Sequence, residues 1–181
     1  LKQSRDFSKK ASEYFEQALS RQDLPIGDRA TLEDLIGRLQ REAGLHGAAS
    51  EKLWKIVNDP EVPKTMRENS SREWLQAESL VRADIFQQLV NAFMARHGKF
   101  PESLTEALRD HLSQPDARAP AWLKDGIRGA TPTDAYGLPL QYDPGKGEVA
   151  SRGVRALQAL RASRIIESLI VSNYSASGRA Y

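Results

Sequence analysis

One long amphipathic segment, residues 71–97, constrains the fold of this chain more than any other feature. Residues 70–73 read Ser-Ser-Arg-Glu, the spacing of a capping box that satisfies free backbone amides at a helix start. Gly98 follows the segment at a position where glycine commonly ends a helix. Apolar residues recur between these signals at helical spacing: Trp74, Ala77, Leu80, Val81, Ile85, Phe86, Leu89, Val90 and Phe93. We therefore expect one long helix here, with the rest of the chain packed on it.

Shorter amphipathic segments fill residues 1–70. An apolar stripe runs along the first of them, at Phe7, Ala11, Phe15, Ala18 and Leu19. Asp28 is placed to cap the second segment, and residues 58–70 have the composition of a polar connector. The sequence predicts helical hairpins in residues 1–70, which are few for a core of their own and so should dock on the long helix.

A β-hairpin is predicted after the long helix. Leu138, Leu140 and Tyr142 alternate with polar residues and proline, and the turn at 143–147 (Asp-Pro-Gly-Lys-Gly) leads into residues 148–151. A last helix is expected from Val154, with a frayed tail over residues 174–181. The predicted fold is α+β and mainly helical, with the small antiparallel hairpin packed on the long helix.

This pattern divides the chain into three parts. Residues 1–70 form a helical, repeat-like region, residues 71–153 hold the long helix and the hairpin, and residues 154–181 form a basic helix and tail. The C-terminal residues 152–181 contain five Arg and one Glu, which gives them a net charge of +4.

Composition and motifs argue against an enzyme. The chain has no cysteine, and its net charge of +2 is no signature of nucleic-acid binding. His46, His97 and His111 lie near predicted helix ends without metal-protease spacing, which favours a role as cations at helix C-termini. Asp134 and Asp143 flank the hairpin, where they could ligate calcium or, as we favour, hydrogen-bond their own turns. We expect no catalytic residue, no cofactor and no metal.

Four residues are candidates for contact with a protein partner. Trp122 stands in a loop rich in proline and glycine, where a large aromatic side chain is typical of an interface anchor. Arg155, Arg161 and Arg164 give the last helix a basic face that suits an acidic partner or a solvated surface. No apolar run is long enough to span a bilayer, so membrane attachment would need an anchor outside this chain.

Residues 79–153 resemble the globular part of type II secretion pseudopilins and of bacterial extracytoplasmic proteins with the same block. In residues 97–104, His-Gly-Lys-Phe-Pro-Glu-Ser-Leu is similar to the family's helix exit His-Gly-x-Phe/Tyr-Pro-x-Ser-Leu. In residues 134–142, Asp-Ala-Tyr-Gly-Leu-Pro-Leu-Gln-Tyr is similar to Asp-Pro-Trp/Phe-Gly-x-Pro-Leu-x-Tyr, and residues 151–153 match Ser-x-Gly. The resemblance implies a non-enzymatic bacterial protein, periplasmic or extracellular, that contacts protein partners of a secretion or envelope assembly.

The chain departs from that family in three places. Helical residues 1–70 precede the block where a pseudopilin has its hydrophobic assembly helix, which argues against polymerisation into a pseudopilus. Residues 154–156, Val-Arg-Ala, stand where the calcium-binding version has an acidic loop, which argues against calcium. The basic C-terminal helix has no counterpart in the family.

Two other functions remain open at the level of sequence. Residues 7–60 faintly resemble tetratricopeptide repeats, because the pattern Ala11, Phe15 recurs as Ala49, Leu53 after 38 residues, near the repeat period of about 34. This alternative is a helical-repeat adaptor, in the cytoplasm or outside it. A hydrolase whose carboxylates come from distant segments is the third possibility.

Overall fold

The structure, a computed structural model, describes residues 2–20, 24–115, 117 and 132–177. Its helices are α1 (Lys2–Leu19), α2 (Ile26–Glu42), α3 (His46–Asn58), α4 (Lys64–His97), α5 (Leu104–Leu112) and α7 (Arg152–Ser177), and its strands are β1 (Gln141–Asp143) and β2 (Glu148–Ala150). The strands pair antiparallel, with Tyr142 opposite Val149. The expected α+β, mainly helical fold is confirmed.

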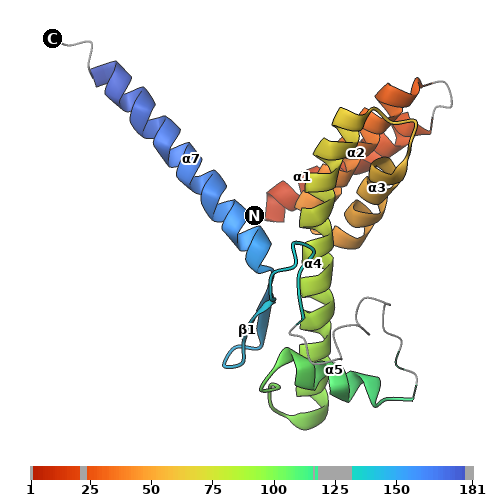
Figure 1. The fold of residues 1–181 in the computed structure, drawn as a ribbon, viewed down its shortest axis with the longest axis vertical. Helices are drawn as coiled ribbons and strands as arrows, with labels where there is room; N and C mark the ends of the chain where they lie inside the picture. Colours follow the sequence, from red (N-terminus) through yellow and green to blue (C-terminus); the bar gives the residue numbers. More distant parts are fainter. Residues whose placement is uncertain (1, 21–23, 116, 118–131, 178–181) are drawn as a thin grey trace.

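Helix α4 is the rod around which the other elements are arranged (Figure 1). Helices α1, α2 and α3 lie beside its upper half, each in contact with the next, and α3 packs on α4 itself. Helix α5 crosses its lower end, and the hairpin lies along its side. The expected packing on the long helix is therefore seen for α2, α3, α5 and β2, whereas α1 packs on α2 and most of α7 projects from the body.

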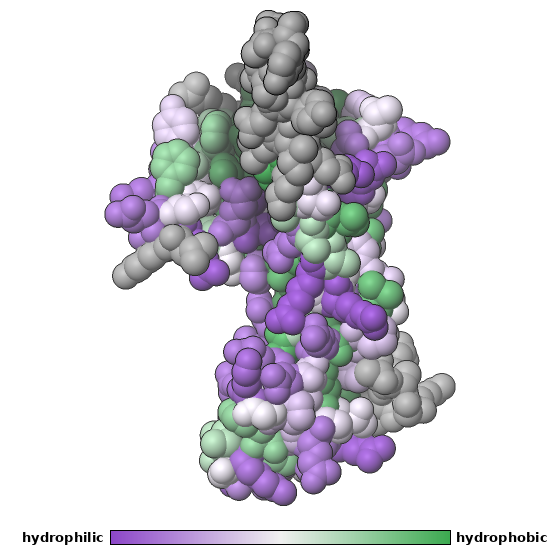
Figure 2. Space-filling view, turned by 90° about the vertical axis from the view of Figure 1, so that its left-hand side faces the viewer, coloured by the Kyte–Doolittle hydropathy of each residue, from purple (hydrophilic) through white to green (hydrophobic). Residues whose placement is uncertain are grey.

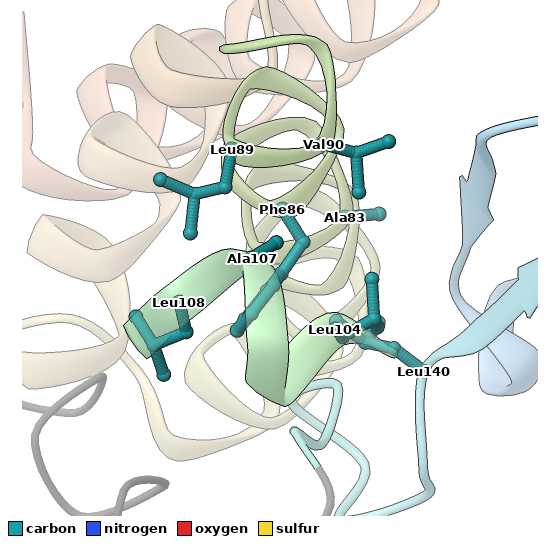
Figure 3. Close-up of a cluster of buried hydrophobic side chains, with 8 residues drawn as sticks. All are labelled: Ala83, Phe86, Leu89, Val90, Leu104, Ala107, Leu108 and Leu140. Carbon is teal, nitrogen blue, oxygen red and sulfur yellow. The ribbon is translucent and has the colours of Figure 1, made fainter. Parts of the chain in front are cut away.

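Two apolar clusters cover different parts of α4. The upper cluster joins α2, α3 and α4 through Ala30, Ala49, Leu53, Ile56, Val62 and Ala77. Gly37 lets α2 approach α3 closely, because a methyl group there would lie 2.7 Å from Cγ of Leu53. The lower cluster, drawn in Figure 3, joins α4, α5 and the hairpin through Ala83, Phe86, Leu89, Val90, Leu104, Ala107, Leu108 and Leu140.

The hairpin is attached to the rod by polar contacts as well as by Leu140. The amide of Gln87 on α4 acts as a third strand for β2: its Oε1 accepts from the Val149 amide (2.9 Å) and its Nε2 donates to the Gly147 carbonyl (2.7 Å). The Tyr142 hydroxyl donates to the Pro101 carbonyl at 2.7 Å. These contacts satisfy an edge of a short sheet that would otherwise face water or an apolar surface.

Helix α4 begins earlier than the capping box predicts. It starts at Lys64 directly after Pro63, so the last seven residues of the predicted connector, 64–70, are helical. Ser70 is fully buried and its hydroxyl donates to Asp34 of α2 (2.7 Å) rather than capping a helix. The capping-box prediction was wrong because Ser70 hydrogen-bonds a residue of another helix instead of capping its own. The helix starts directly after Pro63.

Two predictions in the first helices also need correction. In α1 the buried positions are Ser8 and Ser12, whereas Phe7 on the predicted apolar stripe is 73% exposed. Helix α2 begins at Ile26 with Pro25 at its N-cap, so Asp28 lies in the first turn and does not cap. The other four positions of the stripe, Ala11, Phe15, Ala18 and Leu19, are partly buried, so the predicted periodicity fails at Phe7 alone.

Helix α7 projects from the body of the molecule (Figure 1). It starts at Arg152 and continues to Ser177, so residues 174–177, where fraying was predicted, are helical. Its first turn is anchored by Val154, which is 5% exposed. With 26 residues the helix is about 39 Å long, and its far end lies away from the other helices.

Candidate functional site

The partner-binding candidates fall on α7 and outside the described residues. Trp122 belongs to the segment 118–131, which the structure does not describe. Arg155, Arg161 and Arg164 are all exposed along α7. The three arginines lie on one helix but do not form a single cluster. Arg155 donates to the Gln141 side chain at 2.8 Å, at the base of the hairpin, while the other two lie further along α7.

The first half of α7 is strongly basic. Residues 152–165 carry four arginines and no acidic residue. Leu160 is 58% exposed between these cations. In the space-filling view from the side of α7, hydrophilic residues cover most of the face and hydrophobic ones form separate patches (Figure 2). This arm, residues 152–165, therefore combines four positive charges with an exposed apolar side chain, Leu160, a composition that suits an acidic protein surface.

Asp134 locks the hairpin and α7 together. It is 1% exposed. Its Oδ1 accepts from the backbone amides of Tyr136 and Leu138, both at 3.0 Å. Its Oδ2 accepts from the Ser151 hydroxyl at 2.7 Å and the Gly153 amide at 2.9 Å. One buried carboxylate thus satisfies four donors from both ends of the hairpin.

The neighbours of Asp134 are fitted to it. A Cβ at Gly153 would collide with the Tyr136 ring and lie 3.0 Å from the aspartate Oδ2, so only glycine fits there without a shift. The Ser151 hydroxyl, which donates to Asp134, also accepts from the Val154 amide at the start of α7 (3.1 Å). Burial raises the pKa of Tyr136, and the nearby Asp134 carboxylate adds to this.

The preferred role of the two hairpin aspartates, hydrogen bonding within turns, is confirmed. Asp134 binds the amides of its own turn as described above, and Asp143 accepts from the Gly145 amide at 3.0 Å. The lone pairs that a cation would need on Asp134 are therefore already used by N–H and O–H donors.

The three histidines differ in their surroundings. His97, at the C-terminal end of α4, contacts Oδ1 of Asp110 through Nε2 at 2.8 Å, as suits a cation at a helix C-terminus. His111 lies in the last turn of α5. His46 contradicts the prediction, because it begins α3 rather than ending a helix, and its Nδ1 lies 2.6 Å from Oδ2 of Asp84. A carboxylate partner across the helix interface offsets its position at the positive end of α3.

A hollow of about 650 Å³ lies between the end of α4 and α5. Two carboxyls line it, and both are engaged in structure. Hydrogen bonds from Arg96, and then from His97, lower the pKa of Asp110. Glu106 accepts from the Glu102 amide at 2.6 Å, and its own amide donates to the N-cap Ser103 at 3.2 Å. A general acid needs a raised pKa, so this hollow gives no support to the hydrolase alternative.

The second concave feature is a groove between α3 and α4, which we call the tryptophan groove. It has a volume of about 350 Å³ and is lined by Gly47, Ser50, Glu51, Trp54, Trp74, Glu78 and Val81. The rings of Trp54 and Trp74 lie 4.8 Å apart between centroids and are tilted by 40°. The sequence predicted Trp74 in the core, and it does pack against the upper cluster. Its contact with Trp54 of the preceding helix depends on how α3 packs on α4, which no local pattern predicts.

Comparison of this chain with protein-family models, with curated proteins and with solved structures found no match. Among the helices that the structure describes, none combines the length and apolar character needed to cross a membrane.

Proposed function

We propose that this chain is a non-enzymatic bacterial protein, periplasmic or extracellular, that acts through protein–protein contacts in a secretion or pilus-like assembly. The observation that carries the proposal is the unit that Asp134 holds together. A hairpin folds back on a long helix that ends at Gly98, Tyr142 of the hairpin hydrogen-bonds Pro101 of the helix exit, and one buried carboxylate joins the two ends of the hairpin. This is the unit that the pseudopilin resemblance of residues 79–153 implies.

The basic arm of α7 supports a contact role. Its described part projects from the body and presents Arg155, Arg161 and Arg164 together with the exposed Leu160. Long, flexible basic side chains around an apolar residue suit recognition of an acidic protein surface, where opposite charges speed encounter and fix register. The partner expected for this arm is therefore an acidic protein of the envelope assembly.

The test locates the full-length protein and probes the arm. Fractionation of the source cells, with protease added to spheroplasts, should place the protein outside the cytoplasmic membrane. In-cell crosslinking should give a discrete product that is lost when Arg155, Arg161 and Arg164 are changed together to Glu. Changing the three exposed lysines Lys9, Lys10 and Lys64 to Glu is the matched control, and should leave the product intact. Protein found only in the cytosol, or a product insensitive to the arginines, would refute the proposal.

One observation favours a second candidate, the helical-repeat adaptor. Helices α1 to α4 pack each on the next in the manner of stacked helical repeats, and α1 leaves Phe7 and Tyr14 exposed on its outer side. In that case replacing Phe7 and Tyr14 by Ser would abolish the crosslink, while the arginine changes would not.

A further inference from the structure

We propose that the tryptophan groove binds the cationic side chain of an arginine or lysine supplied by a protein partner. The inference rests on the proposed function, since it presumes that the chain works by contact with another protein. It adds a second surface, distinct from the arm of α7, with the opposite charge preference.

The aromatic part of the argument concerns Trp54. This side chain remains 48% exposed although its ring contacts that of Trp74, which is partly buried against the upper cluster. Both indoles line the groove, so aromatic surface is accessible to a ligand there. The face of an indole carries negative electrostatic potential, and tryptophan is the side chain that binds cations best in this way.

The charged part of the argument concerns the rim. Glu51 and Glu78 line the groove, whereas no described lining residue is a lysine or arginine. Glu78 is held in place, because its Oε2 accepts from Ser50 at 2.8 Å and its Oε1 from Arg82 at 3.2 Å. Glu51 is exposed and pairs with the equally exposed Lys55, an interaction that contributes little and can be exchanged for another cation.

The chemistry of the rim decides between possible occupants. An apolar side chain in the groove would remove water from two carboxylates without replacing their hydrogen bonds, which is costly. A phosphate or an acidic peptide would meet like charges. An arginine or lysine suits both the apolar and the acidic lining of the groove. Its alkyl stem lies against the indoles and Val81, and its charged head reaches the carboxylates. The volume of about 350 Å³ suits one such side chain.

The experiment uses tryptophan fluorescence, because two of the three tryptophans of the chain line the groove. In a Trp122→Phe background the signal reports on Trp54 and Trp74 alone. The probes are three eight-residue glycine-serine peptides that differ only in carrying two arginines, two leucines or two glutamates. We expect saturable binding of the arginine peptide, about tenfold tighter than the leucine peptide, and no binding of the glutamate peptide.

Variants distinguish binding in the groove from attraction to general surface charge. Glu51→Gln leaves the fold intact because Glu51 is exposed, and should weaken the arginine peptide about threefold or more. Trp54→Ala should abolish its binding, measured by calorimetry. Tyr14→Ala, which removes a more exposed aromatic ring on α1, is the matched control and should change nothing. Equal affinity for the leucine peptide, or arginine binding that survives Trp54→Ala, would overturn the proposal.

Failure of this inference can be told from failure of the proposed function. If the arginine peptide does not bind but the protein is outside the cytoplasmic membrane and its arm crosslinks to a partner, the groove assignment is wrong and the function stands. If the peptide binds but the protein lies only in the cytosol, the groove stands and the proposed location is wrong.

Discussion

Replacing Asp134 by asparagine removes one charge at constant shape from the centre of the hairpin unit. The amide nitrogen must take the place of Oδ1 or Oδ2. Placing the nitrogen at the Oδ2 position disrupts the fewest hydrogen bonds, because the Ser151 hydroxyl can rotate and accept instead of donating. Even so, the new N–H group points at the Gly153 amide, which is also a donor. Losing this charge-assisted bond and leaving a buried donor unpaired costs about 3 kcal/mol. For a chain of this length, that corresponds to a melting temperature lower by about 6–12 °C.

The assay has two readouts. Thermal unfolding, monitored by far-UV circular dichroism, measures the overall loss of stability. Hydrogen exchange at residues 134–153 shows whether the hairpin opens separately, as a locally stable unit would. Asp143→Asn is the matched control, because this exposed turn aspartate accepts a single amide, from Gly145, and should lose no more than about 0.5 kcal/mol. If both variants shift the melting temperature equally and neither speeds exchange, Asp134 does not hold the unit together.

Three further changes test other contacts of the rod. Gln87→Ala should cost about 2 kcal/mol and speed amide exchange in β2, and unchanged exchange would contradict its role as a third strand. Gly147→Ala should lower the free energy of unfolding in urea by more than about 2 kcal/mol, because its φ of +67° is left-handed and a Cβ would collide with Phe100. Gly27→Ala is the control: a Cβ there meets open space, so the free energy of unfolding should stay the same or rise. Equal effects of the two substitutions would refute this reasoning. Asp110→Asn should destabilise the protein at pH 7. Its arginine and histidine partners lower the pKa of Asp110, so its contribution is present above about pH 3.9 and is lost as the pH falls through the lowered value; a gap from wild type that persists in acid would contradict this.

The parts of the fold that sequence reasoning predicted correctly are those with local causes. Gly98 ends α4 with φ of 70°, as a glycine after a helical stripe predicts. The turn residues 143–147 join two antiparallel strands, as their composition predicts. Apolar positions such as Phe86, Val90 and Phe93 are buried as their spacing indicates.

The predictions that failed depended on which partner a residue meets. Ser70 has the local pattern of a helix cap, yet a carboxylate on α2 takes its hydroxyl. Phe7 has the spacing of a core residue, yet nothing described covers it and serine fills the interface instead. In both cases the local signal was present, and a contact between segments far apart in the sequence decided the outcome.

The candidate site shows the same division. The basic character of residues 152–165 is a matter of composition, so the sequence alone determines it. The sequence alone does not determine the tryptophan groove, because Trp54 and Trp74 come together only when α3 packs on α4.

Sequence by itself therefore determined where the helices and the hairpin lie and which side chains are apolar, since these follow from the period of the backbone and the chemistry of glycine and proline. Only the tertiary structure decided which polar groups are buried together. Asp134, Gln87 and the two tryptophans meet residues as far as 62 positions away, and no local pattern encodes a partner at that distance.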